Sequence, residues 1–332
     1  MNFGIIGSGS WATALAKILT DNNNLIHWWI RNPGTIHYMQ QRRHNPHYLS
    51  SAYFNTSLLT LNENIEEVIK ESDVIVIAVP SAFIESAFEA LPADSFKGKK
   101  IVSAIKGILP SCNYLLNDYL HDKFQVALSD YFTVLGPCHA EEVASEKLSY
   151  LTFSGADEDM AAQIGEHFHT EYLNTVVNHD VVGVQYAAVL KNIYALGAGI
   201  AHGLEYGDNF LSVYIANAAS EMVSFLRKAV DDGICSQVNY ASSVYFGDLL
   251  VTCYSLYSRN RTFGNMLGKG YSVQSAQLEL NMVAEGFNAS KCIFKTNEKV
   301  GARMPIAKTI YEILWLQLPA IKGFKNIEEI LV

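Results

Sequence analysis

A lysine interrupts the most apolar stretch of the chain. Lys191 lies in the segment AAVLKNIYALGAG, where alanine, valine, leucine and isoleucine predict a buried helix. A buried ammonium is unfavourable unless it is paired, and desolvation lowers its pKa toward the range useful for proton transfer. The alternative is a lysine on the one exposed stripe of that helix. We favour the buried lysine and predict that it is an acid–base group.

A second group of polar residues follows in the segment GDLLVTCYSLYSRNRTFG, which spans 247–264. An aspartate such as Asp248 can pair with a lysine, and the planar fork of Arg259 suits two phosphate oxygens. Ser258 and Asn260 flank that arginine. The alternative is a chance charged loop. We predict instead an anion-binding segment that acts together with Lys191.

A glycine-rich turn opens the chain, in the sequence GSGSWATALA at 7–16. Gly7, Gly9 and Ala12 match the pattern G-x-G-x-x-G/A after an apolar run and before a helical pattern. Gly7 allows a tight turn, Gly9 allows close approach of a pyrophosphate, and the third position needs only a small side chain. A turn without a ligand is the alternative, and the βαβ setting favours dinucleotide binding.

The residue after the second apolar run helps to distinguish NAD from NADP as the bound dinucleotide. That run ends WWIRNP, which places Arg31 where NAD-binding proteins usually carry an acidic residue. An arginine there accommodates the 2′-phosphate of NADP, although a solvated surface arginine is the alternative. The sequence therefore predicts NADP or NAD as the cofactor and favours NADPH.

The elements that must position these residues divide the chain in two. Apolar runs at 2–6, 25–30, 73–79, 100–105, 132–136 and 148–155 are too continuous for strands with one wet face, and helical patterns such as 11–20 and 83–90 separate them. This alternation is typical of a doubly wound, parallel α/β sheet. Helical patterns such as 212–230 and 306–318 dominate the remainder. We predict an α/β dinucleotide-binding domain over 1–180 and an all-α domain over 181–332.

Ligands bind beyond the carboxyl ends of the strands in such a sheet. Lys106 follows the fourth run, and the turn GPCHAEEVA, with Gly136 and Cys138, follows the fifth. We therefore expect a basic residue and a second turn of small residues at the same edge as the glycine-rich turn. Judged by itself, Lys106 fits an ordinary surface lysine equally well.

Composition excludes several other functions. The net charge of −9 argues against nucleic-acid binding by bulk attraction, and the histidines show no metal-ligand spacing, so no metal is expected. The five cysteines are scattered without CxxC spacing, which indicates reduced thiols. No uninterrupted apolar run reaches the length of a membrane span, and the first strand pattern starts at residue 2. We expect a soluble, cytoplasmic protein.

Together these stretches resemble the NAD(P)-dependent glycerol-3-phosphate dehydrogenase family of the bacterial type. The resemblance covers nearly the whole chain and rests on GSGSWATALA, SAIKG, GPCHAEEVA, VLKNIYALGAGIAHGL, GDLLVTCYSLYSRNRTFG and VAEG. It implies a Rossmann domain, an all-α domain and a site in the cleft between them. The implied reaction interconverts dihydroxyacetone phosphate and sn-glycerol 3-phosphate and feeds glycerophospholipid biosynthesis. We also expect a homodimer.

The resemblance implies roles for particular residues. The general base falls on Lys191, with Asp248 as its partner in catalysis. The implied substrate-binding residues are Lys106, Gly136, Cys138, Lys191, Asp248, Ser258, Arg259 and Asn260. The implied cofactor-binding residues are Gly7, Gly9, Ser10, Trp11, Arg31, Lys106, Ala140, Arg259, Val283 and Glu285. The chain departs from the family at Cys138 and His139, where serine or threonine followed by phenylalanine is usual, and a thiol is a poor hydrogen-bond donor.

Two other functions fit parts of this pattern. A hydroxy-acid or sugar-acid dehydrogenase with the same two-domain plan would need a site for a carboxylate. A dinucleotide-binding sensor without turnover would keep the glycine-rich turn but would have no use for Lys191, Asp248 and Arg259. Turnover of dihydroxyacetone phosphate separates both alternatives from the main hypothesis.

Overall fold

The computed structural model describes residues 1–230, 238–280 and 284–332. The chain forms two compact units. The first comprises Met1–Ile105 and Tyr114–Val181, and the second comprises Lys106–Asn113 and Val182–Val332. Residues 106–113 thus pack with the helical unit, although they lie within the range predicted for the dinucleotide-binding domain.

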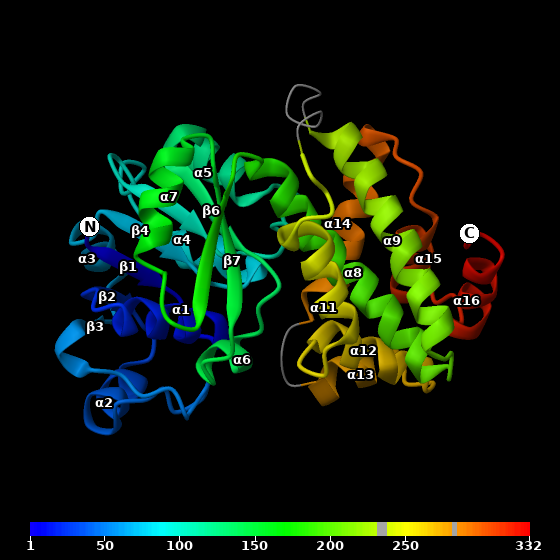
Figure 1. Cartoon of the computed structure of the whole chain (residues 1–332), viewed down its shortest axis with the longest axis horizontal. Helices are drawn as coiled ribbons and strands as arrows, with labels where there is room; N and C mark the ends of the chain where they lie inside the picture. The colour runs from blue at the N-terminus through cyan, green and yellow to red at the C-terminus, as the bar shows by residue number, and fades with distance from the viewer. Residues whose placement is uncertain (231–237, 281–283) are drawn as a thin grey trace. The chain divides into compact units, whose positions relative to one another are not determined.

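The first unit is built on an eight-stranded sheet (Figure 1). Its strands are β1 (Phe3–Ile6), β2 (Ile26–Trp29), β3 (Leu59–Asn62), β4 (Val74–Ile77), β5 (Lys100–Ser103), β6 (Tyr131–Leu135), β7 (Ser149–Gly155) and β8 (Leu173–Asn178). Their order across the sheet is β3-β2-β1-β4-β5-β6-β7-β8. The parallel strands β1 and β4 lie side by side where the order reverses, which is the switch point at which such sheets bind ligands.

The doubly wound α/β class is confirmed, but the sheet is not parallel throughout. Strand β7 pairs antiparallel with β6, with Val134 opposite Phe153, and β8 then runs parallel to β7. The prediction of a parallel sheet is therefore wrong for the pairing of β6 with β7. A strand buried on both faces has the same apolar pattern in either direction, so the sequence does not reveal its orientation.

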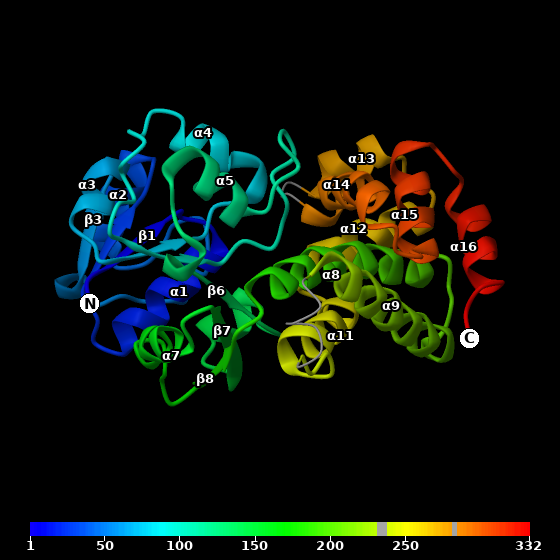
Figure 2. The same cartoon turned by 90° about the horizontal axis from the view of Figure 1, so that it is seen from above.

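Helices cover both faces of this sheet. They are α1 (Ser10–Asp21), α2 (Pro33–Arg42), α3 (Ile65–Lys70), α4 (Ile84–Phe88), α5 (Leu116–Phe124), α6 (Ala140–Ala144) and α7 (Glu158–Glu166). Figure 2 shows α4 and α5 on one face and α1 and α7 on the other. Alternate strand residues such as Phe3, Val74 and Phe132 pack beneath α1 together with Ala12, which is fully buried. The small side chain at Ala12 is what allows helix α1 to approach the strands.

The described part of the second unit is helical. Its helices are α8 (Val181–Gly203), α9 (Asp208–Ala229), the π-helical turn η4 (Ser243–Gly247), α11 (Asp248–Tyr254), α12 (Arg259–Gly268), α13 (Val273–Leu280), α14 (Glu285–Val300), α15 (Pro305–Trp315) and α16 (Ala320–Glu328). Helix α8 is long and apolar enough to cross a membrane by length and composition alone. However, 89% of its most apolar stretch is buried inside the protein, as in a core helix.

Helices α8 and α12 pack with their backbones in close contact. A Cβ atom on Gly264 would lie 1.9 Å from the carbonyl oxygen of Leu196, and one on Gly199 would lie 2.0 Å from that of Arg261. Only glycine fits at these two positions, because a methyl group would collide with backbone that cannot move aside. This contact places the first two turns of α12 against the C-terminal half of α8, the half that follows Lys191.

Candidate active site

The backbone of the glycine-rich turn requires glycine at one of its two glycine positions but not at the other. Gly7 has φ of +120°, and a Cβ atom there would lie 2.6 Å from the carbonyl oxygen of Ala78, so the fold itself requires glycine. Gly9 has φ of −76° and ψ of −177°, which any residue adopts, and a Cβ atom there would meet nothing within 4 Å. The fold therefore leaves open space at Gly9, and that space fits a ligand that must approach the backbone closely.

This open space lies at the N-terminus of α1. Gly9 is the N-cap of the helix and has no side chain to occupy the first N–H groups. Such a helix end carries partial positive charge and free donors, which together attract phosphate groups. Ser10 and Trp11 are the first two residues of α1. The turn thus has the shape and the donors that a dinucleotide pyrophosphate requires.

In the second unit, α8 and α11 bring Lys191 and Asp248 together. Their side chains are 4% and 2% exposed, and Nζ of Lys191 donates a hydrogen bond to Oδ1 of Asp248. Thr252, one turn along α11, donates from Oγ1 to the backbone carbonyl of Asp248 at 2.6 Å. The threonine bond thus holds the backbone of α11 at Asp248, and the carboxylate of Asp248 pairs with the lysine across the helix interface.

The environment of Lys191 makes it a group that can exchange protons near neutral pH. Burial lowers the pKa of Lys191 to about 8; the ammonium of Lys106 also lowers it, while Asp248 acts in the opposite direction. An amine with such a pKa is present in both protonation states close to neutrality, as a general acid and base must be.

Hydrogen bonds through buried amides connect Asn192, the neighbour of Lys191, to three other segments of the same unit. Nδ2 of Asn192 donates to the backbone carbonyl of Lys106 at 3.0 Å, and Nδ2 of Asn260 donates to Oδ1 of Asn192 at 2.9 Å. The backbone N–H of Gly286 donates to Oδ1 of Asn260 at 2.9 Å. These contacts hold the segment 106–113, α8, α12 and α14 together around the lysine. Asn192 is not among the predicted site residues, and its only signal in the sequence is a polar amide next to Lys191 in an apolar helix.

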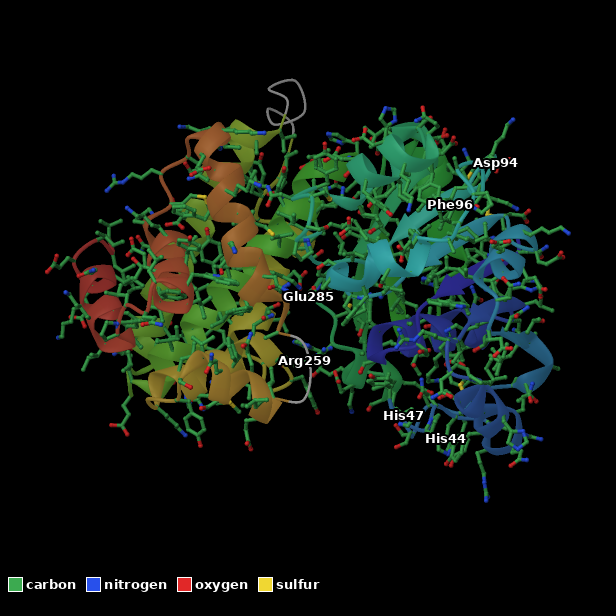
Figure 3. All side chains as sticks on the ribbon, turned by 180° about the vertical axis from the view of Figure 1, so that it is seen from behind. His44, His47, Asp94, Phe96, Arg259 and Glu285 are labelled. Atoms are coloured by element: carbon green, nitrogen blue, oxygen red, sulfur yellow. The ribbon has the colours of Figure 1, made fainter. Side chains whose placement is uncertain are left out.

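The N-terminus of α12 presents an arginine. Ser258 is the N-cap of this helix, and its Oγ accepts a hydrogen bond from the N–H of Arg261 at 3.3 Å. Arg259, the first helical residue, is exposed, and among the described residues its guanidinium has no hydrogen bond or ion pair. Figure 3 labels Arg259 and Glu285, which begin α12 and α14. A free guanidinium at a helix N-terminus is well suited to an anion.

Comparison with known proteins identifies the relatives of this chain. Residues 2–161 match the family model described as NAD-dependent glycerol-3-phosphate dehydrogenase N-terminus, and residues 180–324 match the corresponding C-terminus. A glycerol-3-phosphate dehydrogenase (NAD(P)+) from Chlorobium chlorochromatii is 32% identical over 328 residues, which cover 98% of this chain and 97% of the relative. The chain belongs to the NAD-dependent glycerol-3-phosphate dehydrogenase family.

Two further relatives bear this name. The glycerol-3-phosphate dehydrogenase (NAD(P)+) of Bacillus subtilis is 31% identical over 312 residues, covering 94% of this chain and 89% of that protein. The solved structure of glycerol-3-phosphate dehydrogenase from Coxiella burnetii superposes with a TM-score of 0.88 at 24% identity and covers 99% of this chain and 98% of the other. This likeness confirms the predicted fold class for a glycerol-3-phosphate dehydrogenase family member.

The remaining residues that the family resemblance singled out lie in both units. Arg31 follows β2 and is exposed, while Ala140 begins α6 and is buried. Gly136 has φ of +147°, and a Cβ atom there would lie 2.8 Å from the carbonyl oxygen of Tyr150, so its own turn requires glycine. The thiol of Cys138 donates to that same carbonyl at 3.2 Å. Cys138 therefore holds its turn against β7.

Other predicted residues belong to the second unit or are not described. Lys106 lies in the segment that Asn192 holds, and Glu285 starts α14 next to Gly286. Val283 lies outside the described residues. Within the described ranges, no group of three or more histidine, cysteine, aspartate or glutamate side chains could hold a metal ion.

Alanine substitutions at the two glycines of the turn should affect different properties of this glycerol-3-phosphate dehydrogenase family member, one cofactor binding and the other stability. Gly9→Ala should leave the thermal midpoint of the unliganded protein unchanged but raise the Kd for NADPH by about 10- to 100-fold, the equivalent of one charge-assisted hydrogen bond. Gly7→Ala should lower the free energy of unfolding by about 2 kcal/mol, because alanine is strained at this positive φ. Thermal melts and fluorescence titration check both. An unchanged Kd for Gly9→Ala would contradict the assignment of the open space to the cofactor.

Proposed function

We propose that this protein interconverts dihydroxyacetone phosphate and sn-glycerol 3-phosphate with NADP or NAD as the hydride carrier. The observation that carries the proposal is the buried pair of Lys191 and Asp248 in the same unit as the free guanidinium of Arg259. A proton donor and an anion site are what a phosphorylated ketone requires for reduction. Membership of the glycerol-3-phosphate dehydrogenase family supports the substrate and the cofactor.

The first unit would hold the cofactor. The open space at Gly9 and the N–H groups at the start of α1, including those of Ser10 and Trp11, would bind the pyrophosphate. When bound, the nicotinamide supplies a hydride to the ketone or accepts one from the alcohol. No carboxylate follows β2, so the ribose end would be bound beside Arg31.

The second unit would bind the substrate and move the proton. Arg259 and the N-terminus of α12 would bind the phosphate group, with Ser258 capping that helix. As the carbonyl oxygen gains negative charge, the ammonium of Lys191 would stabilise it and donate a proton, and the neutral amine would take that proton back in the reverse reaction. Asp248 would hold the amine in place in both directions. Asn260 would support the site through Asn192 and Gly286.

The pKa of Lys191 predicts opposite pH dependences for the two directions. Ketone reduction needs the protonated amine, so its kcat/KM should fall as the pH rises through about 8. Oxidation of glycerol 3-phosphate needs the neutral amine, so its kcat/KM should rise through the same range. Measurements between about pH 7 and pH 10 keep the substrate phosphate ionised, since its second pKa is near 6. Profiles that move in the same direction would contradict the role of Lys191.

The preference between the two dinucleotides is a separate prediction. If Arg31 binds the 2′-phosphate, Arg31→Ala should lower the ratio of kcat/KM for NADPH to that for NADH by about tenfold. This factor corresponds to the lower end of the free energy that a charge-assisted hydrogen bond contributes, because the site is exposed. The ratio contains its own control, because NADH has no 2′-phosphate. A ratio equal to that of the unaltered protein would show that another residue reads this group.

Initial rates of dihydroxyacetone phosphate reduction with each dinucleotide in turn test the proposal as a whole. We expect turnover with this ketone and none with 2-oxo acids of similar size. A preference for a 2-oxo acid would indicate a hydroxy-acid dehydrogenase instead. Binding of NADPH without turnover of either class of substrate would indicate a sensor.

We also propose that the protein is a cytoplasmic homodimer. Exposed apolar side chains on α9 and α11 support a second copy as the partner: Val213, Leu250 and Tyr254 are 42%, 39% and 42% exposed. Such side chains in neighbouring helices are typical of a protein–protein contact. Light scattering of the purified protein gives the mass in solution, and a mass of one chain would contradict the dimer.

A further inference from the structure

A buried asparagine after α2 is attached to the glycine-rich turn. Asn45 is 1% exposed, and its Nδ2 donates to the carbonyl of Ser8 at 3.1 Å and to Oγ1 of Thr13 at 2.9 Å. Its Oδ1 accepts from the N–H groups of His47 at 3.0 Å and Tyr48 at 3.3 Å. Both donors and both acceptor positions of the carboxamide are therefore in use.

Thr13 extends this contact to the next peptide of the turn. It lies in the first turns of α1 and is fully buried. Its hydroxyl, which accepts from Asn45, donates to the carbonyl of Gly9 at 2.9 Å, and its own N–H also donates to that carbonyl at 2.9 Å. Asn45 thus fixes the carbonyl of Ser8 directly and that of Gly9 through Thr13.

Fixing these carbonyls also fixes the direction of two N–H groups. A peptide unit is planar and trans, so the C=O of one residue and the N–H of the next point in opposite directions. With the carbonyl of Ser8 held by Asn45, the N–H of Gly9 points away from Asn45. With the carbonyl of Gly9 held by Thr13, the N–H of Ser10 points out of the N-terminus of α1. These are the donors next to the open space at Gly9.

We propose that Asn45 is a positioning residue for the dinucleotide pyrophosphate. It would hold the N–H groups of Gly9 and Ser10 in the direction that the phosphates need, so that binding does not have to order them. This inference rests on the proposed binding of NADP or NAD to the turn. The same carboxamide also holds the backbone at His47 and Tyr48, so the segment after α2 and the glycine-rich turn are fixed by one side chain; Figure 3 labels His44 and His47 on this segment.

Two variants of different kinds test the positioning role. Asn45→Asp keeps the shape and the acceptor but replaces the donors to Ser8 and Thr13 with a carboxylate oxygen that would repel the carbonyl. Thr13→Val is close in shape but removes the hydroxyl, and with it the acceptor for Asn45 and the side-chain hydrogen bond to the carbonyl of Gly9, while the backbone N–H bond to that carbonyl stays. We expect each to raise the Kd for NADPH by about 10- to 100-fold. ADP-ribose, which keeps the pyrophosphate, should lose affinity equally, whereas kcat at saturating NADPH and the KM for dihydroxyacetone phosphate should stay within about twofold.

The matched control is Asn24→Asp. Nδ2 of Asn24 also donates to backbone carbonyls within the first unit, those of Leu19 and His167, each at 3.0 Å, but neither belongs to the turn. This control should also lower the thermal midpoint, by less than Asn45→Asp does because Asn24 is only partly buried, and leave the Kd for NADPH unchanged.

The outcomes separate this inference from the proposed function. If the unaltered protein binds neither NADPH nor NADH, both fail. If it binds NADPH and the variants of Asn45 and Thr13 bind equally well, only the positioning role is overturned. The role is also overturned if Asn24→Asp weakens binding as much as Asn45→Asp does, because the loss would then follow stability rather than the turn. Should Asn45→Asp not fold, Thr13→Val alone decides between these outcomes.

Discussion

Replacing Lys191 with methionine is expected to lower kcat for dihydroxyacetone phosphate reduction by about 10⁴-fold, the scale of a lost general acid that also stabilises the developing alkoxide. The expectation follows from the position of its ammonium, which is buried, paired with Asp248 and lowered in pKa to about 8. Binding of NADPH should be unchanged, because the glycine-rich turn belongs to the other unit. Steady-state rates and a fluorescence titration measure the two effects.

The stability of this variant needs its own control. Removing the lysine leaves Asp248, whose side chain is 2% exposed, as an uncompensated buried charge, and breaking such a pair costs about 3–5 kcal/mol. The double variant Lys191→Met with Asp248→Asn removes both charges and should recover most of the thermal stability without recovering turnover. A folded double variant with turnover near that of the unaltered protein would show that the proton comes from another group.

The strands that the sequence predicted are those in the middle of the sheet. Most of them are buried on both faces and are rich in apolar residues, as in β4 with the sequence VIVI. The two strands that were not predicted, β3 and β8, form the two edges of the sheet. Their sequences, LTLN and LNTVVN, contain polar residues and are only partly buried, because an edge strand has less of the protein packed against it. The alternation in β3 covers only four residues and β8 has no regular alternation, so neither sequence gives a strong strand pattern.

The site was predictable where a residue breaks a strong pattern. Lys191 stands out because a charge in an apolar helix is rare, and Gly7 stands out because its spacing from Gly9 matches a known turn. Asn45 breaks no pattern that a single sequence can show, since an asparagine before a proline is ordinary, and Asn192 interrupts the apolar helix only where Lys191 already does. Their roles come from partners far away in the chain, such as Ser8 for Asn45 and Lys106 for Asn192.

The sequence also contains no sign that the segment 106–113 belongs to the helical unit. Lys106 directly follows the end of a buried strand run, so it was assigned to the sheet domain. In the structure, Asn192 binds the carbonyl of Lys106 and Thr296 accepts a hydrogen bond from Asn113 at 2.9 Å, and both partners lie in the helical unit. Tertiary hydrogen bonds of this kind carry no local signature in composition or periodicity.

Replacing Arg259 with alanine is expected to raise the KM for dihydroxyacetone phosphate by about 100-fold or more, while the Kd for NADPH changes little. Two charge-assisted hydrogen bonds to a phosphate contribute about 3–5 kcal/mol together, and the N-terminus of α12 would retain part of the affinity. Arg303→Ala is the matched control, because this arginine is also exposed and lies in the second unit but not at the start of α12. Steady-state kinetics over a wide range of ketone concentration measure the effect.

Arg259 was assigned to both the substrate and the cofactor, and a ketone without a phosphate group separates these roles. Dihydroxyacetone has the same reacting carbonyl but nothing for the guanidinium to bind. If Arg259 binds the substrate phosphate, Arg259→Ala should lower kcat/KM for dihydroxyacetone phosphate by about two orders of magnitude and leave the slow reduction of dihydroxyacetone nearly unchanged. Equal losses for both ketones would place the guanidinium on the cofactor or on the reacting carbonyl, since those are what the two reactions share.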